Sequence, residues 1–337
     1  MEAHLAGAAA SDVLIISTGA FRPSIADSTL ASGSHDGRIP RGAVTTRQPL
    51  IIEAAINGAT PKAMSSHVPR TVPEIVACAC ACLEAGAAIV HHHNDDGLLE
   101  GRHATAPYRE AWTAICARHP EALLYPTMGG GGPRTHIRER YAHVEELADA
   151  GLLRLAIIDP GSVSLGSLDA DRLPAAIDLV YQNTFADVRY MVDVCRARGL
   201  AAHVSIFEPG FLRVALAYQA ARGLPAAKIQ LYFGGPELPF GLPPTAASLD
   251  AYLAMLAGSG LLWMVGVLGG DVTASLAQLA IDRGGHVRVG LEDYAGPRQP
   301  RNEELVAEVV EMARRSGRAV ATQGQTAEIL GVRPSVG

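Results

Sequence analysis

Short aliphatic runs alternate with amphipathic stretches along most of this chain, from Leu50 to the C-terminus. Apolar runs of roughly four to eight residues bounded by turn signals predict buried strands of a parallel sheet, and the longer amphipathic stretches predict helices. A helical stretch follows each of eight predicted strands, which begin near Leu50, Ala87, Ala122, Leu153, Ala201, Lys228, Leu261 and His286.

Eight such units in succession predict one (β/α)8 TIM barrel, a fold of the α/β class. Helix-start signals agree, since Thr71 precedes Pro73 and Glu74 ahead of an apolar helical stretch. An open doubly wound sheet is the main alternative. It needs a glycine-rich phosphate loop after its first strand, which residues 56–60 lack. We therefore expect residues 49–337 to form a single barrel domain with a C-terminal helix.

The first 48 residues have a different composition. Residues 18–48 are rich in Ser, Gly, Pro, Asp and Arg, which is typical of irregular structure. We predict that residues 1–48 form an irregular N-terminal arm. Two roles stay open for it: crossing a subunit interface, or a simple extension.

Charge and hydropathy exclude several classes of partner. The net charge is -6 and the chain has no concentrated basic patch, which argues against a nucleic-acid or membrane-surface partner. No apolar run approaches the roughly 20 residues of a membrane span, and residues 1–10 lack the positive region of a signal peptide. We expect a cytoplasmic protein.

The five cysteines are odd in number and fall in apolar helical patterns, which fits a reducing compartment better than a disulfide framework. On a helix, Cys78 and Cys82 share one face while Cys80 points elsewhere. We favour helix packing over a metal site for this cysteine run.

The strand predicted from Ala87 ends abruptly in polar residues, in the order His91, His92, His93, Asn94, Asp95 and Asp96. Alternate residues of a strand share a face, so His91 and His93 project together while His92 turns away. Two imidazoles on one strand are suitable ligands for zinc or a similar divalent metal. The alternative is that one histidine lies in the core and the others in a polar loop.

The last predicted strand also ends in charge, at Glu292 and Asp293. A carboxylate there completes a two-histidine metal site or acts as a general base. Capping of the next helix or pairing with an arginine is the alternative. In a barrel the strand ends share one mouth, so the candidate residues His91, His93, Thr127, Asp159, Glu208, Glu292 and Asp293 are all expected there.

Two segments resemble the β-keto acid cleavage enzyme family, over roughly residues 50–331. Residues 86–93 resemble its GA-x-x-[VI]-H-x-H strand, and residues 286–293 resemble its H-x-R-x-G-x-E-D segment. The resemblance implies a zinc ion held by His91, His93 and Glu292, with Asp293 as the base. It also implies acetyl-CoA as co-substrate, acetoacetate and a new acyl-CoA as products, and a homotetramer.

Further roles follow from the same resemblance. Arg288 is expected to bind a substrate carboxylate or to orient Asp293, with a structural ion pair as the alternative. Thr127 matches a serine of the family, and its hydroxyl is expected to hold an oxyanion or a carboxylate.

The chain also departs from the family. Thr60 stands where the typical enzyme has an acid that meets an ammonium group, so an aminated substrate is not expected. Ile157, Asp159 and Ser205 replace a threonine, an asparagine and an acid, although Glu208 lies close by. Glu53 replaces a hydroxyl residue, and its orientation, inward or outward, is left open. The residues expected on the substrate side are Glu53, Asn57, Thr60, Asp159 and Glu208.

Two other functions compete with this interpretation. A metal-dependent hydrolase of the amidohydrolase kind is also a barrel with an H-x-H pair, and His203 with Asp293 fits it. Its H-x-H would lie on the first strand, however, not the second. The other is a barrel that binds a metal or an acyl ligand without catalysis, but a binder needs no base beside its metal.

Overall fold

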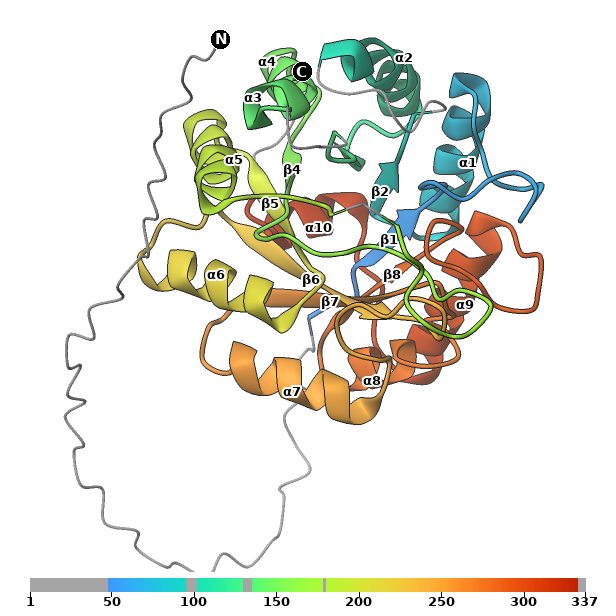
Figure 1. Ribbon diagram of the computed structural model, residues 1–337. Helices are drawn as coiled ribbons and strands as arrows, with labels where there is room; N and C mark the ends of the chain where they lie inside the picture. Colours follow the sequence, from blue (N-terminus) through green and yellow to red (C-terminus); the bar gives the residue numbers. More distant parts are fainter. Residues whose placement is uncertain (1–47, 95–101, 130–134, 178–179, 333–337) are drawn as a thin grey trace, which may run out of the picture. The chain divides into compact units, whose positions relative to one another are not determined.

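Eight parallel strands form a nearly closed barrel in the computed structural model, which describes residues 48–94, 102–129, 135–177 and 180–332 (Figure 1). The strand order is β3-β2-β1-β8-β7-β6-β5-β4, and β3 and β4 at its two ends contact each other. The predicted TIM barrel is therefore confirmed. The strands are β1 (Ile52–Ala55), β2 (Ile89–His92), β3 (Leu123–Pro126), β4 (Leu155–Ile158), β5 (Ala201–Ile206), β6 (Ala227–Gly234), β7 (Leu262–Leu268) and β8 (His286–Val289).

Helices lie outside the strands, and the barrel helices follow their strands in the predicted alternation (Figure 1). At the start of α1 the Thr71 hydroxyl accepts from the Glu74 backbone in a capping box, as the sequence predicted. The helices are α1 (Val72–Ala85), α2 (Arg102–Arg118), α3 (Ile137–Arg140), α4 (Ala142–Asp149), α5 (Phe185–Arg198), α6 (Pro209–Ala220), α7 (Ala246–Leu256), α8 (Ala277–Asp282), α9 (Asn302–Arg315) and α10 (Gln323–Ile329).

Strand β1 lies between β2 and β8, and this order brings the two polar strand ends together. Ala55 pairs with His91 of β2, and Glu53 pairs with Arg288 of β8. Because parallel strands present their carboxyl ends at one edge, the segments that follow β1, β2 and β8 meet there.

The strands of the barrel are apolar outside and partly polar inside. Ile52 and Ala54 of β1 belong to the hydrophobic core, whereas Glu53 between them is fully buried among charged partners. This alternation follows from the two-residue period of a strand. Glu53 therefore faces the barrel interior, which settles the orientation that the sequence left open.

None of the helices in the described part of the chain is long and apolar enough to cross a membrane. Apart from Gln48, the predicted arm of residues 1–48 lies outside the described residues.

Candidate active site at the carboxyl ends of the strands

Two histidines and one glutamate converge where β2 and β8 end. The Nε2 atom of His91 lies 3.3 Å from one carboxylate oxygen of Glu292, and Nε2 of His93 lies 3.6 Å from the other. One donor atom from each residue lies within 4.8 Å of the other two. His91 and His93 therefore share a face, as predicted. His92 turns to the outside of the barrel, where its Nε2 accepts from the Trp112 indole N–H at 2.8 Å.

The ring of His91 is held in one orientation by Tyr125. Its Nδ1 lies 3.2 Å from the Tyr125 carbonyl oxygen, and the two rings stack at 4.4 Å between centroids. A carbonyl only accepts, so Nδ1 carries the proton and Nε2 offers a free lone pair toward Glu292. Burial lowers the pKa of His91 below its ordinary value, which keeps the imidazole neutral.

Asn57, after β1, positions His93. Its Oδ1 accepts from the His93 backbone N–H at 2.8 Å, and its Nδ2 donates to the His93 carbonyl at 2.9 Å. The side chain is fully buried. The Asn57 amide is therefore satisfied by backbone that it holds in place.

The loop after β1 packs directly on Glu292. A Cβ atom on Gly58 would lie 2.3 Å from Cγ of Glu292, and Gly58 has a φ of +49°. Only glycine accommodates both the backbone conformation and the close approach. The Thr60 hydroxyl donates to the Leu291 carbonyl at 2.9 Å, which ties the same loop to the turn that carries Glu292.

The donor set suits a divalent cation. Two imidazoles and a carboxylate are ordinary ligands of zinc. Oε2 of Glu292 is buried and has no hydrogen-bond partner among the described residues, so it has capacity for a cation. Burial opposes ionisation of this carboxyl, but the positive charge of Arg288 holds its pKa well below the usual range. These residues therefore fit the metal that the sequence predicted.

Arg288 organises the carboxylates beside this group. Its Nε and Nη2 atoms each lie 2.9 Å from an oxygen of Asp293, a two-point contact. Nη2 also lies 2.8 Å from Glu292. The sequence suggested that Glu292 and Asp293 end the last strand. Strand β8 instead ends at Val289, and the two acids lie in the turn that follows it. The guanidinium is fully buried and contacts both oxygens of Asp293, a geometry compatible with the predicted orienting role.

Burial raises the pKa of Asp293 from its ordinary value to about 6, despite the opposing effect of Arg288. Gly266 of β7 lies against this carboxylate, since a Cβ atom there would be 3.4 Å from Oδ2. Asp293 is thus a buried carboxylate of fixed orientation and moderate basicity, which are the properties of a general base.

Glu53 forms a buried ion pair with Arg288 inside the barrel. Its Oε1 accepts from Nη1 of Arg288 at 3.1 Å and from the Tyr125 hydroxyl at 2.5 Å, and its Oε2 lies 2.5 Å from Nζ of Lys228. Glu53 is fully buried, and the cationic and hydroxyl groups that its carboxylate contacts belong to the chain itself.

Sequence reasoning gave no role to Tyr125 or Lys228. The available signal was the period of two in strand β6, where Lys228, Gln230 and Tyr232 alternate with apolar residues. His203 of β5, considered for a hydrolase, lies 2.7 Å from Lys228 Nζ through its Nδ1.

The remaining predicted residues occupy neighbouring strand ends. Thr127 follows β3, where its carbonyl accepts from Nε2 of His143 at 2.8 Å. Asp159 follows β4 and accepts from the Tyr181 hydroxyl, and burial raises its pKa. Glu208 accepts from the Gly241 backbone N–H at 2.8 Å. These contacts are made with α4 and with other loops of the described chain, and not with His91, His93 or Glu292.

Fold and site together define a (β/α)8-barrel enzyme with a histidine–carboxylate centre at its strand ends. The chain belongs to the β-keto acid cleavage enzyme family, whose model matches residues 49–332.

Several relatives support this assignment. The chain is 29% identical over 292 residues to a 3-keto-5-aminohexanoate cleavage enzyme of Fusobacterium nucleatum, covering 84% of this chain and 98% of that one. It is 30% identical over 277 residues to a 3,5-dioxohexanoate:acetyl-CoA acetone transferase of Paraburkholderia graminis, covering 74% of this chain and 84% of that one. It is 29% identical over 295 residues to a 3-oxoadipate:acetyl-CoA acetyltransferase of Cupriavidus necator, covering 85% of this chain and 95% of that one.

A solved structure shares the fold. The apo structure of ObcA matches with a TM-score of 0.60 at 20% identity, over 79% of this chain and 66% of that one.

Proposed function

We propose that this enzyme uses a zinc ion, or a similar divalent cation, to cleave a β-keto acid with acetyl-CoA. His91, His93 and Glu292 would hold the cation. The observation that carries the proposal is the convergence of these three donors beside an aspartate that Arg288 holds by two contacts. Relatives at 29–30% identity are named as acetyl-CoA-dependent transferases, which supports the same class of reaction.

The chain's own residues supply the proton transfer. Asp293 would remove the proton from the carbon between ketone and carboxylate, and a pKa of about 6 suits a base that works near neutral pH. Arg288 keeps both oxygens of Asp293 in place. A bound divalent cation would act as a Lewis acid on the keto oxygen and stabilise the developing negative charge. Thr127 is proposed to donate its hydroxyl to a substrate oxyanion or carboxylate.

After this proton transfer, the proposed reaction makes and breaks bonds in three steps. The substrate carbanion attacks the carbonyl carbon of acetyl-CoA and expels CoA thiolate. The thiolate then attacks the former ketone carbon, and the bond between that carbon and the original carbanion carbon breaks. The products are acetoacetate, after protonation, and a new acyl-CoA.

The substrate side chain is proposed to be uncharged or anionic. Thr60 carries no charge, so it offers no carboxylate for an ion pair with an ammonium group, and its hydroxyl donates to the Leu291 carbonyl. Asp159 and Glu208 stay candidates for substrate contact. A homotetramer is the assembly that the family resemblance implies.

A panel of neutral, anionic and cationic β-keto acids tests the proposal. The zinc-loaded enzyme is incubated with acetyl-CoA and each acid, and acetoacetate and new acyl-CoA are followed by mass spectrometry. Acetoacetate should form only when both substrates are present. Absence of exchange with every acid, despite stoichiometric zinc, would contradict the proposal and favour the non-catalytic binder. The hydrolase is disfavoured because His203 is engaged with Lys228.

A further inference from the structure

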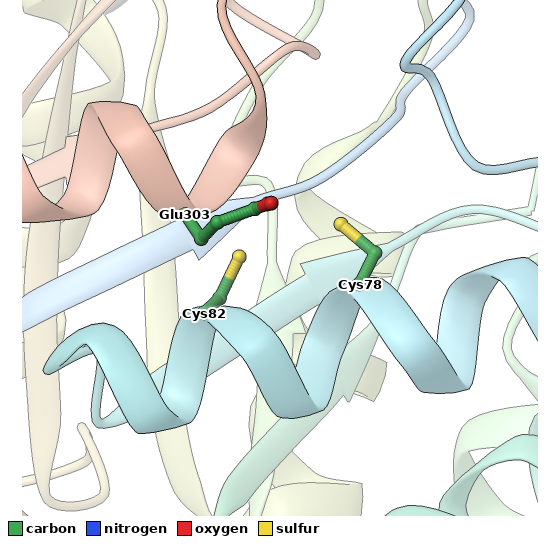
Figure 2. A group of neighbouring side chains, drawn as sticks. All are labelled: Cys78, Cys82 and Glu303. Atoms are coloured by element: carbon green, nitrogen blue, oxygen red, sulfur yellow. The ribbon is translucent and has the colours of Figure 1, made fainter.

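A second group of metal-binding side chains lies outside the barrel, between α1 and α9. Figure 2 shows the sulfur atoms of Cys78 and Cys82 and the carboxylate of Glu303 turned toward one another. One donor atom from each lies within 4.8 Å of the other two. The sequence correctly placed the two cysteines on one helix face, but helix packing alone does not explain the carboxylate that meets them.

The positions of the three residues follow from local geometry. Cys78 and Cys82 are four residues apart on α1, so their side chains lie one above the other. Glu303 is in the first turn of α9. Its neighbour Asn302 orients the group: Nδ2 lies 3.3 Å from Sγ of Cys78 and also donates to the Ile56 carbonyl.

Glu303 brings a carboxylate to the two thiols of this group. The nearest guanidinium that pairs with Glu303 is that of Arg301, at 4.0 Å, and its side chain is 58% exposed. Such an exposed pair contributes little, so it opposes the approach of a cation to Glu303 only weakly.

An ion has a path to the group. Cys78 and Glu303 line a cavity of about 410 Å³ beside α1, whose other lining residues include the cationic Lys62 and Arg301 as well as His67 and Glu74. Cys82 is fully buried behind them. The site is thus closed on one side and open to water on the other.

We propose that Cys78, Cys82 and Glu303 form a second cation site, selective for zinc or another divalent metal that favours thiolates. Binding displaces the two thiol protons, so that two thiolates and one carboxylate face the dication. A water from the cavity completes a tetrahedral shell. This site is independent of the proposed function, because none of its ligands belongs to the barrel mouth.

Cobalt is the probe of choice, because thiolate ligation of Co²⁺ gives a sulfur-to-metal charge-transfer band that a histidine–carboxylate site lacks. The full-length protein is titrated with Co²⁺ in a phosphine reductant. In the unaltered protein we expect the band together with one equivalent of Co²⁺ at this site, in addition to any Co²⁺ bound at the barrel mouth. The double variant C78S/C82S should lose the band and one equivalent. C116S, which changes a half-buried cysteine of α2, should keep both.

A second measurement needs no variant. Zinc should protect Cys78 from alkylation while Cys116 stays reactive, as read by peptide mass spectrometry. E303Q should keep both thiols but bind Co²⁺ more weakly. Absence of the band in the unaltered protein, its persistence in C78S/C82S, or equal alkylation of Cys78 with and without zinc would each overturn the site. None of these readouts depends on turnover, so failure here leaves the proposed function untouched.

Discussion

Glu53 and Arg288 face each other inside the barrel, from paired positions on β1 and β8, with Oε1 and Nη1 3.1 Å apart. Arg288 in turn binds both oxygens of Asp293. The proposed base therefore depends on a carboxylate 240 residues earlier in the chain, the difference between positions 293 and 53. This chain of contacts is the basis of the first two predictions.

Replacing Glu53 by Gln should destabilise the enzyme by about 3–5 kcal/mol, because Lys228 and Arg288 then lose a buried counter-charge. Urea unfolding at constant pH measures this loss. The double variant E53Q/K228M removes the second buried charge and should recover part of the stability. Equal stability of E53Q and the unaltered enzyme would show that the ion pair contributes nothing.

Replacing Arg288 by Lys keeps the charge but removes the two-point contact with Asp293. We expect a large fall in kcat, with KM less affected, because the substitution disturbs the base and not a substrate contact. Steady-state kinetics with the preferred β-keto acid provides the measurement. A change in KM alone would instead indicate that Arg288 binds the substrate.

Replacing Asp293 by Asn should lower kcat by about 10²–10⁴-fold, since an amide cannot accept the proton. The zinc content should not change, because Asp293 is not among the three donors. Activity and metal content are measured on the same sample. Unchanged acetyl-CoA-dependent turnover would exclude Asp293 as the base.

Replacing Gly58 by Ala should weaken metal binding at the barrel mouth by about 10–100-fold, because the new Cβ displaces Glu292. Gly151 offers a matched control: its φ is +72°, but a Cβ atom there would have nothing within 4 Å. Both variants carry the backbone strain, and only G58A carries the clash. Competition with a chelator measures the affinity, and equal loss in both variants would assign the effect to strain.

Stability should fall as the pH drops below about 6.5. Burial holds the pKa of His203 and His286 at about 3 and that of His143 at about 4. Their folded pKa values are depressed, so below the ordinary value the unfolded chain binds protons that the folded chain does not. Each histidine then contributes a slope of up to about 1.4 kcal/mol per pH unit.

Urea unfolding at several pH values between 7.5 and 5 measures this slope. The variant H286Q should reduce the pH dependence of the unfolding free energy by the contribution of one histidine. The Gln side-chain carbonyl can accept the hydrogen bond that the Ile51 N–H now donates to Nδ1 of His286, so the fold should be kept. A slope unchanged in H286Q would show that this histidine titrates normally in the folded protein.

The sequence by itself determined the strands, the barrel and the pairing of His91 with His93. These features depend on short-range periodicity, which backbone geometry fixes at two residues per strand repeat and 3.6 per helical turn. The capping box at Thr71 is local for the same reason.

Only the tertiary structure decided which side chains meet. Glu53 faces Lys228 and Arg288, and Glu303 faces Cys78 and Cys82, because of strand order, register and helix packing. The sequence therefore predicted each strand end as a set of candidates and suggested that Arg288 orients Asp293, but it did not predict the partners of Glu53 or Asn57. Contacts between residues more than 200 positions apart depend on the closed barrel, which no local pattern specifies.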